Sequence, residues 1–194
     1  MKTFRLLFAV LAFSVMLAGC KDSPPSSGAG KAASAPVSVA AIQSEATGFT
    51  AGSAMSVRTV YVFFDSQCPH CAALWQAAKP LKSQAKFVWM PVRILNDSSL
   101  AQGATLLAAK DPVALMDEHE TSILAKGGGI SAASGIDAQK AQVTKNTEVF
   151  NRFGFASIPT IVGTHAQTGA LVTKEGSLPT ADLARLLGLQ APAN

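Results

Sequence analysis

The sequence contains few cysteines, no concentrated basic run and no long apolar run beyond its first twenty residues. With three cysteines in 194 residues, each one has to be explained individually. The formal net charge of +4 is spread along the chain, which gives no indication of a nucleic-acid partner. The later part of the chain offers no candidate for a membrane-spanning helix. The length suits one ordinary domain with a hydrophobic core, together with tails.

The first twenty residues have the pattern of an export signal. Lys2 and Arg5 precede an apolar run over residues 6–17, which is too short for an ordinary transmembrane helix. The stretch closes in Leu-Ala-Gly followed by Cys20, which resembles the bacterial lipobox. In that family the cysteine is acylated and becomes the new N-terminus. The alternative is a plain secretory peptide with an incidental cysteine.

This pattern predicts three parts of the chain: a signal peptide over residues 1–19, a lipidated Cys20 with a flexible tether over residues 20–39, and one domain over residues 40–194. The tether is rich in Ser, Pro, Gly and Ala, so it cannot bury enough apolar surface to order itself. The lipid would hold the protein on the periplasmic face of a bacterial membrane. Lys21, in place of an aspartate after the lipidated cysteine, favours the outer membrane.

Strand and helix patterns alternate in the first part of the domain. Residues 57–64 are β-branched and aromatic, which suits a central strand covered on both faces. A helix is expected over residues 72–79, with Pro69 in its first turn and Pro80 bending or ending it. Residues 86–95 resemble a second strand, in which Pro91 favours an edge position or an irregularity.

The rest of the domain begins with a long helical segment over residues 98–153, interrupted by an Asp-Pro pair and by three consecutive glycines. Its last helix is expected to end at Gly154. Short strands are expected at residues 160–162 and 170–173, and Thr180 opens a final amphipathic helix. The order of these elements predicts an α/β domain with an inserted helical layer.

The sequence Cys68-Pro69-His70-Cys71 lies at the predicted strand-to-helix turn. A Cys68 thiolate there would face unpaired backbone N–H groups and the positive end of the helix dipole. His70 adds a positive charge or a hydrogen-bond donor, so the pKa of Cys68 should fall. Cys71 lies one turn inside the helix and suits a resolving thiol. Stabilising the reduced pair would make its disulfide a stronger oxidant.

Three other uses of the two cysteines compete with redox chemistry. Zinc would need further ligands, and only His119 and His165 remain to supply nitrogen. A c-type haem would need a histidine directly after Cys71, where Ala72 stands. A structural disulfide with so short a ring would stabilise the fold little. We therefore predict a redox site without metal or cofactor, and expect His119 on a solvated helix face and His165 in a polar turn.

Taken together, these features resemble the thioredoxin superfamily, and within it the periplasmic DsbC/DsbG type of thiol:disulfide interchange protein. The resemblance covers roughly residues 45–190 and rests on residues 60–65, the Cys-Pro-His-Cys sequence, Trp75, residues 106–112, residues 150–154 and Ile158-Pro159. It implies a thioredoxin-like fold with a helical insertion between the second strand and the cis-proline loop.

The resemblance also implies a role for each site residue. Cys68 would be the attacking thiolate and Cys71 the resolving thiol. Pro159 would be the cis-proline beside the active disulfide, and Ile158 would pair with a substrate backbone. The dipeptide Pro69-His70 is that of the DsbA-type oxidases and would tune the site.

The sequence departs from these relatives in three respects. The N-terminal dimerisation domain of DsbC and DsbG is not expected here, so we predict a monomer, and the isomerase activity of that type stays open. Ile158 replaces the threonine that usually precedes the cis-proline. Thioredoxin keeps a buried acid where this chain has Val62, so no proton acceptor for Cys71 is evident.

These features predict an exported thiol–disulfide oxidoreductase that exchanges disulfides with periplasmic proteins and is served by a membrane partner of the DsbB or DsbD type. Pro-His favours an oxidase, and the DsbG-like body favours a reductase. The sequence leaves the direction and the substrates open. The alternative is a copper- or zinc-binding or chaperone-like protein that uses the same scaffold without turnover.

Overall fold

The structure, a computed structural model, describes residues 34–192. The predicted signal peptide, the lipidated Cys20 and the tether up to residue 33 lie outside the described residues. Among the helices within the described range, none combines the length and the hydrophobicity needed to cross a membrane.

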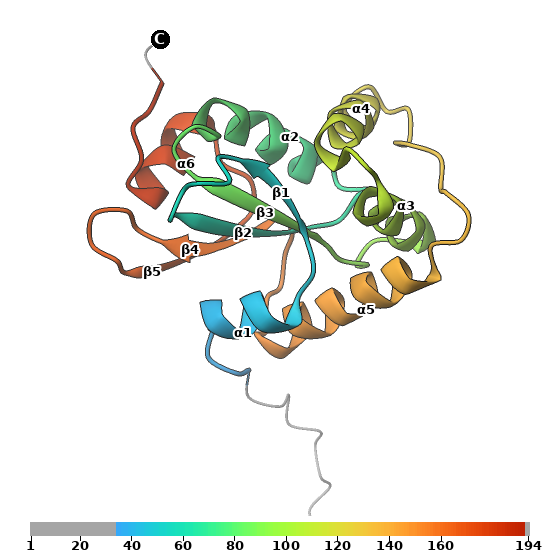
Figure 1. Cartoon of the computed structure of the whole chain (residues 1–194), viewed down its shortest axis with the longest axis horizontal. Coiled ribbons are helices and arrows are strands. Elements are labelled where there is room, and N and C mark those ends of the chain that lie inside the picture. The colour runs from blue at the N-terminus through green and yellow to red at the C-terminus, as the bar shows by residue number, and fades with distance from the viewer. Residues whose placement is uncertain (1–33, 193–194) are drawn as a thin grey trace, which may run out of the picture. The chain divides into compact units, whose positions relative to one another are not determined.

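A five-stranded sheet forms the centre of the domain (Figure 1). Its strands lie in the order β1–β3–β2–β4–β5. β2 and β3 run parallel, and the other neighbouring pairs are antiparallel. The strands span Phe49–Gly52 (β1), Thr59–Phe64 (β2), Lys86–Pro91 (β3), Thr160–Thr164 (β4) and Leu171–Glu175 (β5).

Helices cover both faces of this sheet (Figure 1). They span Val39–Glu45 (α1), Pro69–Ala78 (α2), Asp97–Ala108 (α3), Pro112–Leu124 (α4), Asp137–Arg152 (α5) and Thr180–Leu187 (α6), with a 3₁₀ turn at Lys79–Leu81. The predicted α/β class, with its helical insertion before the second half of the sheet, is therefore confirmed.

The central strand β2 is buried on both faces, which explains its continuous apolar sequence. Because alternate side chains of a strand point to opposite faces, its even-numbered residues join the core formed with α2 and α6. Tyr61 and Phe63 join a second core, formed with α1 and α5. Both sides of β2 are thus fixed by packing, and the turn that follows it is held firmly.

The strand-to-helix turn forms as the sequence predicts. Cys68 is the N-cap of α2 and Pro69 is its first helical residue, where a missing N–H costs nothing. The helix ends at Ala78, and Pro80 lies in the following 3₁₀ turn. This places Cys68 at the N-terminus of the helix and Cys71 inside its first turn.

The expectation of an edge position for the strand containing Pro91 is wrong. β3 lies between β1 and β2, inside the sheet. Proline is tolerated because it is the last residue of β3, beyond Trp89, where the pairing with β1 ends. Its carbonyl oxygen accepts a hydrogen bond from Nδ2 of Asn146 on α5 (2.9 Å).

The inserted helices have clear sequence boundaries. Asn96 and Ser99 form a capping box at the start of α3, and the Asp111 side chain caps α4 ahead of Pro112. α5 ends before Gly154, whose φ of 72° is the left-handed conformation that glycine adopts readily. These signals explain why the predicted breaks in the helical segment are where the helices end.

The sequence analysis assigned no element to residues 39–52, which form α1 and β1. Both are short, and β1 alternates buried and exposed residues over only four positions.

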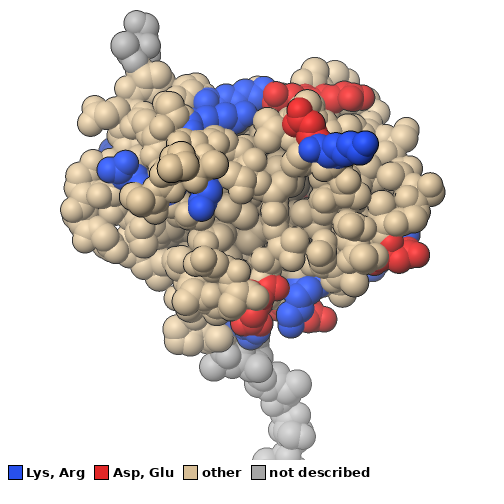
Figure 2. Space-filling model, viewed as in Figure 1, with Lys and Arg blue, Asp and Glu red and all other residues tan. Residues whose placement is uncertain are grey.

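The face shown in Figure 2 is mostly uncharged, with small basic and acidic groups often beside one another.

Candidate active site

Three segments distant in sequence meet at one edge of the sheet. β2 and β3 are parallel and both end at this edge, whereas the antiparallel β4 begins there. The turn after β2 carries Cys68, and the segment before β4 carries Ile158 and Pro159. The Ile158–Pro159 peptide bond is cis, and Cys68 Sγ lies 4.0 Å from the Ile158 carbonyl oxygen. The predicted thiol and cis-proline residues are therefore neighbours.

The buried Asp65 holds the backbone of this edge. Its carboxylate accepts hydrogen bonds from the N–H groups of Gln67 (2.8 Å), Ile94 (2.8 Å) and Leu95 (3.0 Å). The Asp65 carbonyl oxygen accepts from the N–H of Cys68 (3.0 Å). One side chain thus joins the turn after β2 to the loop after β3, and the sequence analysis did not single it out.

The two cysteines differ sharply in acidity. Cys68 is 5% exposed, and hydrogen bonds from the Cys71 thiol, from the backbone of Cys71 and His70, and the charge of His70 lower its pKa to about 6, against the opposing effect of burial. Burial, followed by the hydrogen bond and charge of Cys68, raises the pKa of the fully buried Cys71 well above its ordinary value. Cys68 is therefore a thiolate at neutral pH, and Cys71 remains a thiol.

The surroundings of Cys68 leave it open to a partner on one side. Pro69 and His70 are exposed, as are Ala156 and Ser157 ahead of the cis bond. Ile158 is half-buried, and its N–H has no hydrogen-bond partner within residues 34–192. An extended peptide backbone fits such a free edge.

The structure corrects the expectation for His119. This side chain is fully buried, and its Nε2–H donates a hydrogen bond to the Ser66 carbonyl oxygen (2.6 Å) while Nδ1 accepts from the N–H of Ile130 (3.1 Å). One donor and one acceptor on the ring define the neutral tautomer. Burial lowers the pKa of His119, against the hydrogen bond to Ser66 and the charge of Asp65. It therefore joins α4 to the active-site turn as an uncharged group.

A second connection runs from the active-site turn to the loop after α4. The amide Nε2 of Gln67 donates to Gln102 Oε1 (2.5 Å) and to the Gly128 carbonyl oxygen (3.0 Å). Gln102 Nε2 donates to the carbonyl oxygens of Gly128 and Ile130, both at 2.8 Å. The inserted helices are thus hydrogen-bonded to the turn that carries the thiolate.

Glu120, the residue after His119, is also fully buried. Neither carboxyl oxygen has a hydrogen-bond partner within the described part of the chain. Burial, and then the charges of Cys68 and Asp65, raise the pKa of Glu120 to about 9. A sequence signal was present, because Val113, Met116 and Ile123 place residue 120 on the same apolar face at helical spacing.

The metal-binding alternatives find little support in this geometry. Residues 34–192 contain no cluster of three or more His, Cys, Asp or Glu side chains able to hold a metal ion. Both ring nitrogens of His119 are already engaged, and His165 lies in the turn between β4 and β5.

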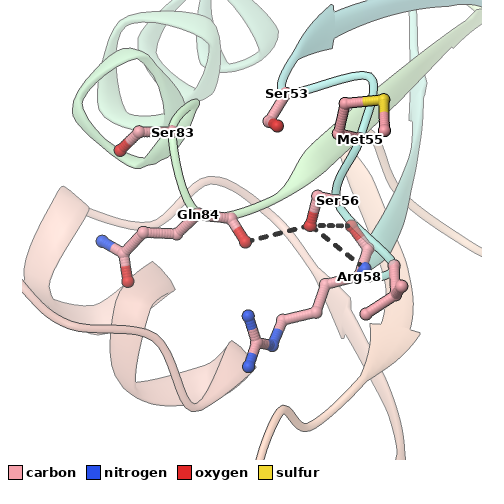
Figure 3. A pocket seen from close by; sticks show the side chains of 7 residues that line it. Ser53, Met55, Ser56, Arg58, Ser83 and Gln84 are labelled. Carbon is pink, nitrogen blue, oxygen red and sulfur yellow. Dashed lines mark hydrogen bonds between the residues drawn. The ribbon is translucent and has the colours of Figure 1, made fainter.

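A surface hollow of about 460 Å³ lies at the other end of β2 (Figure 3). The Ser56 hydroxyl donates to the Gln84 carbonyl oxygen (3.2 Å) and accepts from the Arg58 N–H (3.1 Å). Met55 and Val57, which help to line it, are 91% and 94% exposed. Because β2 spans roughly 20 Å, this hollow is separate from the cysteine site.

The sheet, the helices on both its faces and the cysteine pair at the start of α2 define a thioredoxin-like domain. The chain belongs to the thioredoxin-like domain family, whose sequence profile matches residues 51–191. It is 31% identical over 140 residues to the thiol:disulfide interchange protein DsbG of Pseudomonas aeruginosa, which covers 71% of this chain and 54% of DsbG. The chain therefore spans about half the length of that relative. The predicted resemblance to the DsbC/DsbG type is confirmed.

Solved structures share the fold at low sequence identity. The catalytic domain of Proteus mirabilis ScsC superposes with a TM-score of 0.59 at 15% identity, covering 76% of this chain and 91% of that one. A periplasmic thioredoxin-like protein from Salmonella enterica serovar Typhimurium gives 0.55 at 16% identity, covering 73% and 88%.

Proposed function

We propose that this protein is a thiol–disulfide oxidoreductase acting on exported proteins through Cys68 and Cys71. The observation that carries the proposal is the unequal acidity of the pair: a Cys68 thiolate at the mouth of α2 and a buried Cys71 thiol one turn behind it. An attacking thiolate and a protected resolving thiol are what two-step exchange requires.

In the reducing direction, the Cys68 thiolate attacks a substrate disulfide. A mixed disulfide forms between Cys68 and one substrate sulfur, and the other substrate sulfur leaves as a thiolate. Cys71 then loses its proton and attacks Cys68 Sγ, which releases the second substrate thiolate and forms the Cys68–Cys71 disulfide. The substrate gains the two electrons that the dithiol loses. The reverse sequence oxidises a substrate dithiol.

The segment around Ile158 supports a protein substrate. Its N–H, which has no hydrogen-bond partner in the described part of the chain, and its carbonyl oxygen, 4.0 Å from Cys68 Sγ, lie where an extended substrate backbone would add to the edge of the site. The Pro159 carbonyl is already bonded to the Gly176 N–H (2.8 Å), which holds the loop against β5. Ile158 therefore orients the substrate, and Pro159 fixes the loop that presents it.

The low pKa of Cys68 favours the oxidising direction, because it stabilises the reduced protein relative to the disulfide. An oxidase of this kind is re-oxidised by a membrane partner of the DsbB type, and a reductase is re-reduced by one of the DsbD type. Equilibration with glutathione buffers, followed by thiol alkylation, separates the two. A midpoint near about −120 mV marks an oxidant, and one at or below about −200 mV a reductant.

Variants of the two cysteines test the assignment itself. Cys68→Ser should abolish exchange, whereas Cys71→Ser should accumulate mixed disulfides because the resolving thiol is missing. A pair that shows no reversible exchange in any glutathione buffer would contradict the proposal and favour a binding protein without turnover.

The export signal supports an exported, lipid-anchored protein, and the Salmonella neighbour described as periplasmic agrees with this compartment. Fractionation of cells that produce the full chain tests the anchor. The protein should sediment with membranes, the outer membrane in particular, and Cys20→Ser, which lacks the acylated cysteine, should lose the outer-membrane location. An unchanged distribution of that variant would contradict lipidation at Cys20.

A further inference from the structure

The buried carboxyl group of Glu120 has no role in the exchange steps above. It is fully buried, and its two oxygens lack hydrogen-bond partners among the described residues. Burying an acid without a partner destabilises a protein. A group that costs stability and bonds to nothing nearby is a candidate for function.

Contacts between α4 and the active-site segment locate Glu120. Asp117 Oδ1 on α4 accepts from Trp75 Nε1 (2.6 Å), one turn after Cys71 on α2. Two residues further along α4, His119 reaches back to the Ser66 carbonyl oxygen (2.6 Å), just ahead of Cys68. Later residues of α4 therefore lie beside earlier residues of the segment that contains α2. Glu120 follows His119 and lies at the end of α2 that carries both cysteines.

Packing agrees with this location. Met116 lies one helical turn before Glu120 on the same face of α4, and it belongs to the core cluster that contains Cys68 and Cys71. Glu120 therefore faces the core that also contains the cysteine pair, and its side chain is shielded from solvent.

We propose that Glu120 exchanges the proton of Cys71 during thiol–disulfide exchange, directly or through one water molecule. This inference rests on the proposed function. It supplies, from the inserted helix α4, the proton acceptor that was not evident at Val62 in β2.

The proton balance is simple in both directions. When the dithiol reduces a substrate, Cys71 in the mixed disulfide passes its proton to the Glu120 carboxylate, and the resulting Cys71 thiolate attacks Cys68 Sγ. When the disulfide oxidises a substrate, the substrate thiolate attacks Cys68 and Cys71 leaves as a thiolate, which takes the proton of the Glu120 carboxyl. In the reducing direction the Glu120 carboxyl first releases its proton to solvent after the mixed disulfide has formed, and in the oxidising direction the Glu120 carboxylate takes a proton from solvent afterwards, so both sequences return Glu120 to its protonated state.

The charge on Cys68 influences when Glu120 can accept the proton. In the reduced protein the Cys68 thiolate helps to keep Glu120 protonated. Once Cys68 enters a mixed disulfide its negative charge is lost, so one of the two charges that raise the pKa of Glu120 disappears and Glu120 ionises more easily at the step at which Cys71 must ionise.

Few other ionisable groups face this site. The Asp65 carboxylate lies on the turn after β2, where three backbone N–H groups donate hydrogen bonds to it, and burial, together with the hydrogen bond from the Ile130 N–H, keeps the neighbouring His119 neutral. Of the other elements against α4, β1 has no ionisable side chain, and Asp97 of α3 is exposed and paired with Arg93 (2.8 Å). Because the Asp65 carboxylate is already occupied by backbone N–H groups, Glu120 is the acid at this site whose oxygens have no hydrogen-bond partner among residues 34–192.

The test is a two-phase reaction with 5,5′-dithiobis(2-nitrobenzoate), one equivalent per protein. The full chain carries Cys20→Ser, so that Cys68 and Cys71 are its only thiols. Attack by Cys68 releases one thionitrobenzoate, and attack by Cys71 on the mixed disulfide releases the second. Stopped-flow absorbance separates the two phases between pH 5 and 10. Glu118→Gln is the matched control, because Glu118 is an exposed acid on the same helix.

Glu120→Gln should leave the first phase within about twofold and slow the second at neutral pH by roughly tenfold or more. The difference should shrink toward high pH, where hydroxide removes the Cys71 proton. Glu120→Asp should restore much of the rate, and Glu118→Gln should match the unsubstituted chain. An unchanged thermal midpoint of Glu120→Gln would show that folding is not the cause.

Other outcomes have distinct meanings. If the second phase of Glu120→Gln follows the control at every pH, Glu120 has no part in the proton transfer, although the exchange function stands. If the unsubstituted chain shows no second phase, the exchange function fails and the inference with it. If Glu120→Gln fails to fold, Glu120→Leu takes its place, and a second phase of Glu120→Leu that follows the control at every pH would overturn the proposal.

Discussion

At the scale of single residues, the acidity of Cys68 comes from groups within three positions of it. The Cys71 thiol, two backbone N–H groups and the charge of His70 all stabilise the thiolate. The helix start supplies most of these interactions, so they follow directly from placing Cys68 at the N-cap. His70 is the contributor that a side-chain substitution removes without disturbing the backbone or the second cysteine.

His70→Ala should therefore raise the pKa of Cys68 toward its ordinary value. We expect alkylation of Cys68 by iodoacetamide at pH 6 to slow by roughly two- to fivefold. The matched control is His165→Ala, a histidine in the turn between β4 and β5, which should leave the rate unchanged. Equal rates for both variants would show that His70 does not contribute to the thiolate.

At the scale of elements, the inserted helices hold the active-site turn in place. His119 and the pair Gln67–Gln102 connect that turn to α4 and to the loop around Gly128. Gly129 packs closely against His119, because a Cβ atom added at residue 129 would lie 2.7 Å from His119 Nδ1. At Gly128 an added Cβ would meet nothing within 4 Å in the described structure.

The pair Gly129→Ala and Gly128→Ala isolates this contact. Both glycines have a similar positive φ, 86° and 83°, so both substitutions incur about 1 kcal/mol of backbone strain. Gly129→Ala should lower the free energy of unfolding by roughly a further 1–3 kcal/mol, because His119 must move from its hydrogen bonds. Urea denaturation measures the difference. Equal losses would mean that His119 adapts without cost.

Sequence patterns predicted the elements whose signals are local. The apolar run of β2, the proline at the start of α2, the Asp-Pro break before α4, and Gly154 are all readable within a few residues. β1 has only four residues and is defined by pairing with β3, some 40 positions later. The edge position expected from Pro91 was wrong because the sequence does not show how far β1 extends along β3.

The candidate site was predictable in the same uneven way. The cysteine pair and Ile158-Pro159 carry recognisable motifs, whereas His119 and Glu120 stand in a locally polar stretch. Their burial depends on Ser66, more than 50 residues earlier, and on the face of α4 that meets α2. The helical spacing of Glu120 with Met116 and Ile123 indicated that Glu120 lies on the buried face of α4, whereas its charged sequence neighbours indicated an exposed stretch.

At the scale of the whole molecule, the Cys68 thiolate couples folding to pH. Its folded pKa of about 6 lies below the ordinary 9.0, so its stabilising contribution is complete above pH 9 and is lost as the pH falls through 6. At pH 7 this amounts to about 1.4 kcal/mol in the reduced protein, or about 30 mV in the potential of the pair. Glu120 acts with the opposite sign, because its folded pKa is raised from 4.5 to about 9.

The free energy of unfolding of the reduced protein, relative to Cys68→Ser, should therefore rise between pH 6 and pH 9. Urea denaturation of both proteins at several pH values under reducing conditions measures the difference. In the Glu120→Gln background, stability itself should decline less over the same range. A difference between the reduced protein and Cys68→Ser that stays constant with pH would show that the thiolate is not stabilised by folding.

The aromatic core under α2 gives the domain an internal optical signal. Trp75 lies one turn after Cys71, and its ring packs edge-on against Trp89 at 4.9 Å between centroids. These are the only two tryptophans of the chain, and both are fully shielded from solvent. Their fluorescence therefore comes from one site beside the cysteine pair, at the short emission wavelengths of a dry interior. Since a neighbouring disulfide quenches indole emission more strongly than thiols do, the redox state of the protein can be followed by its intrinsic tryptophan fluorescence, without any label.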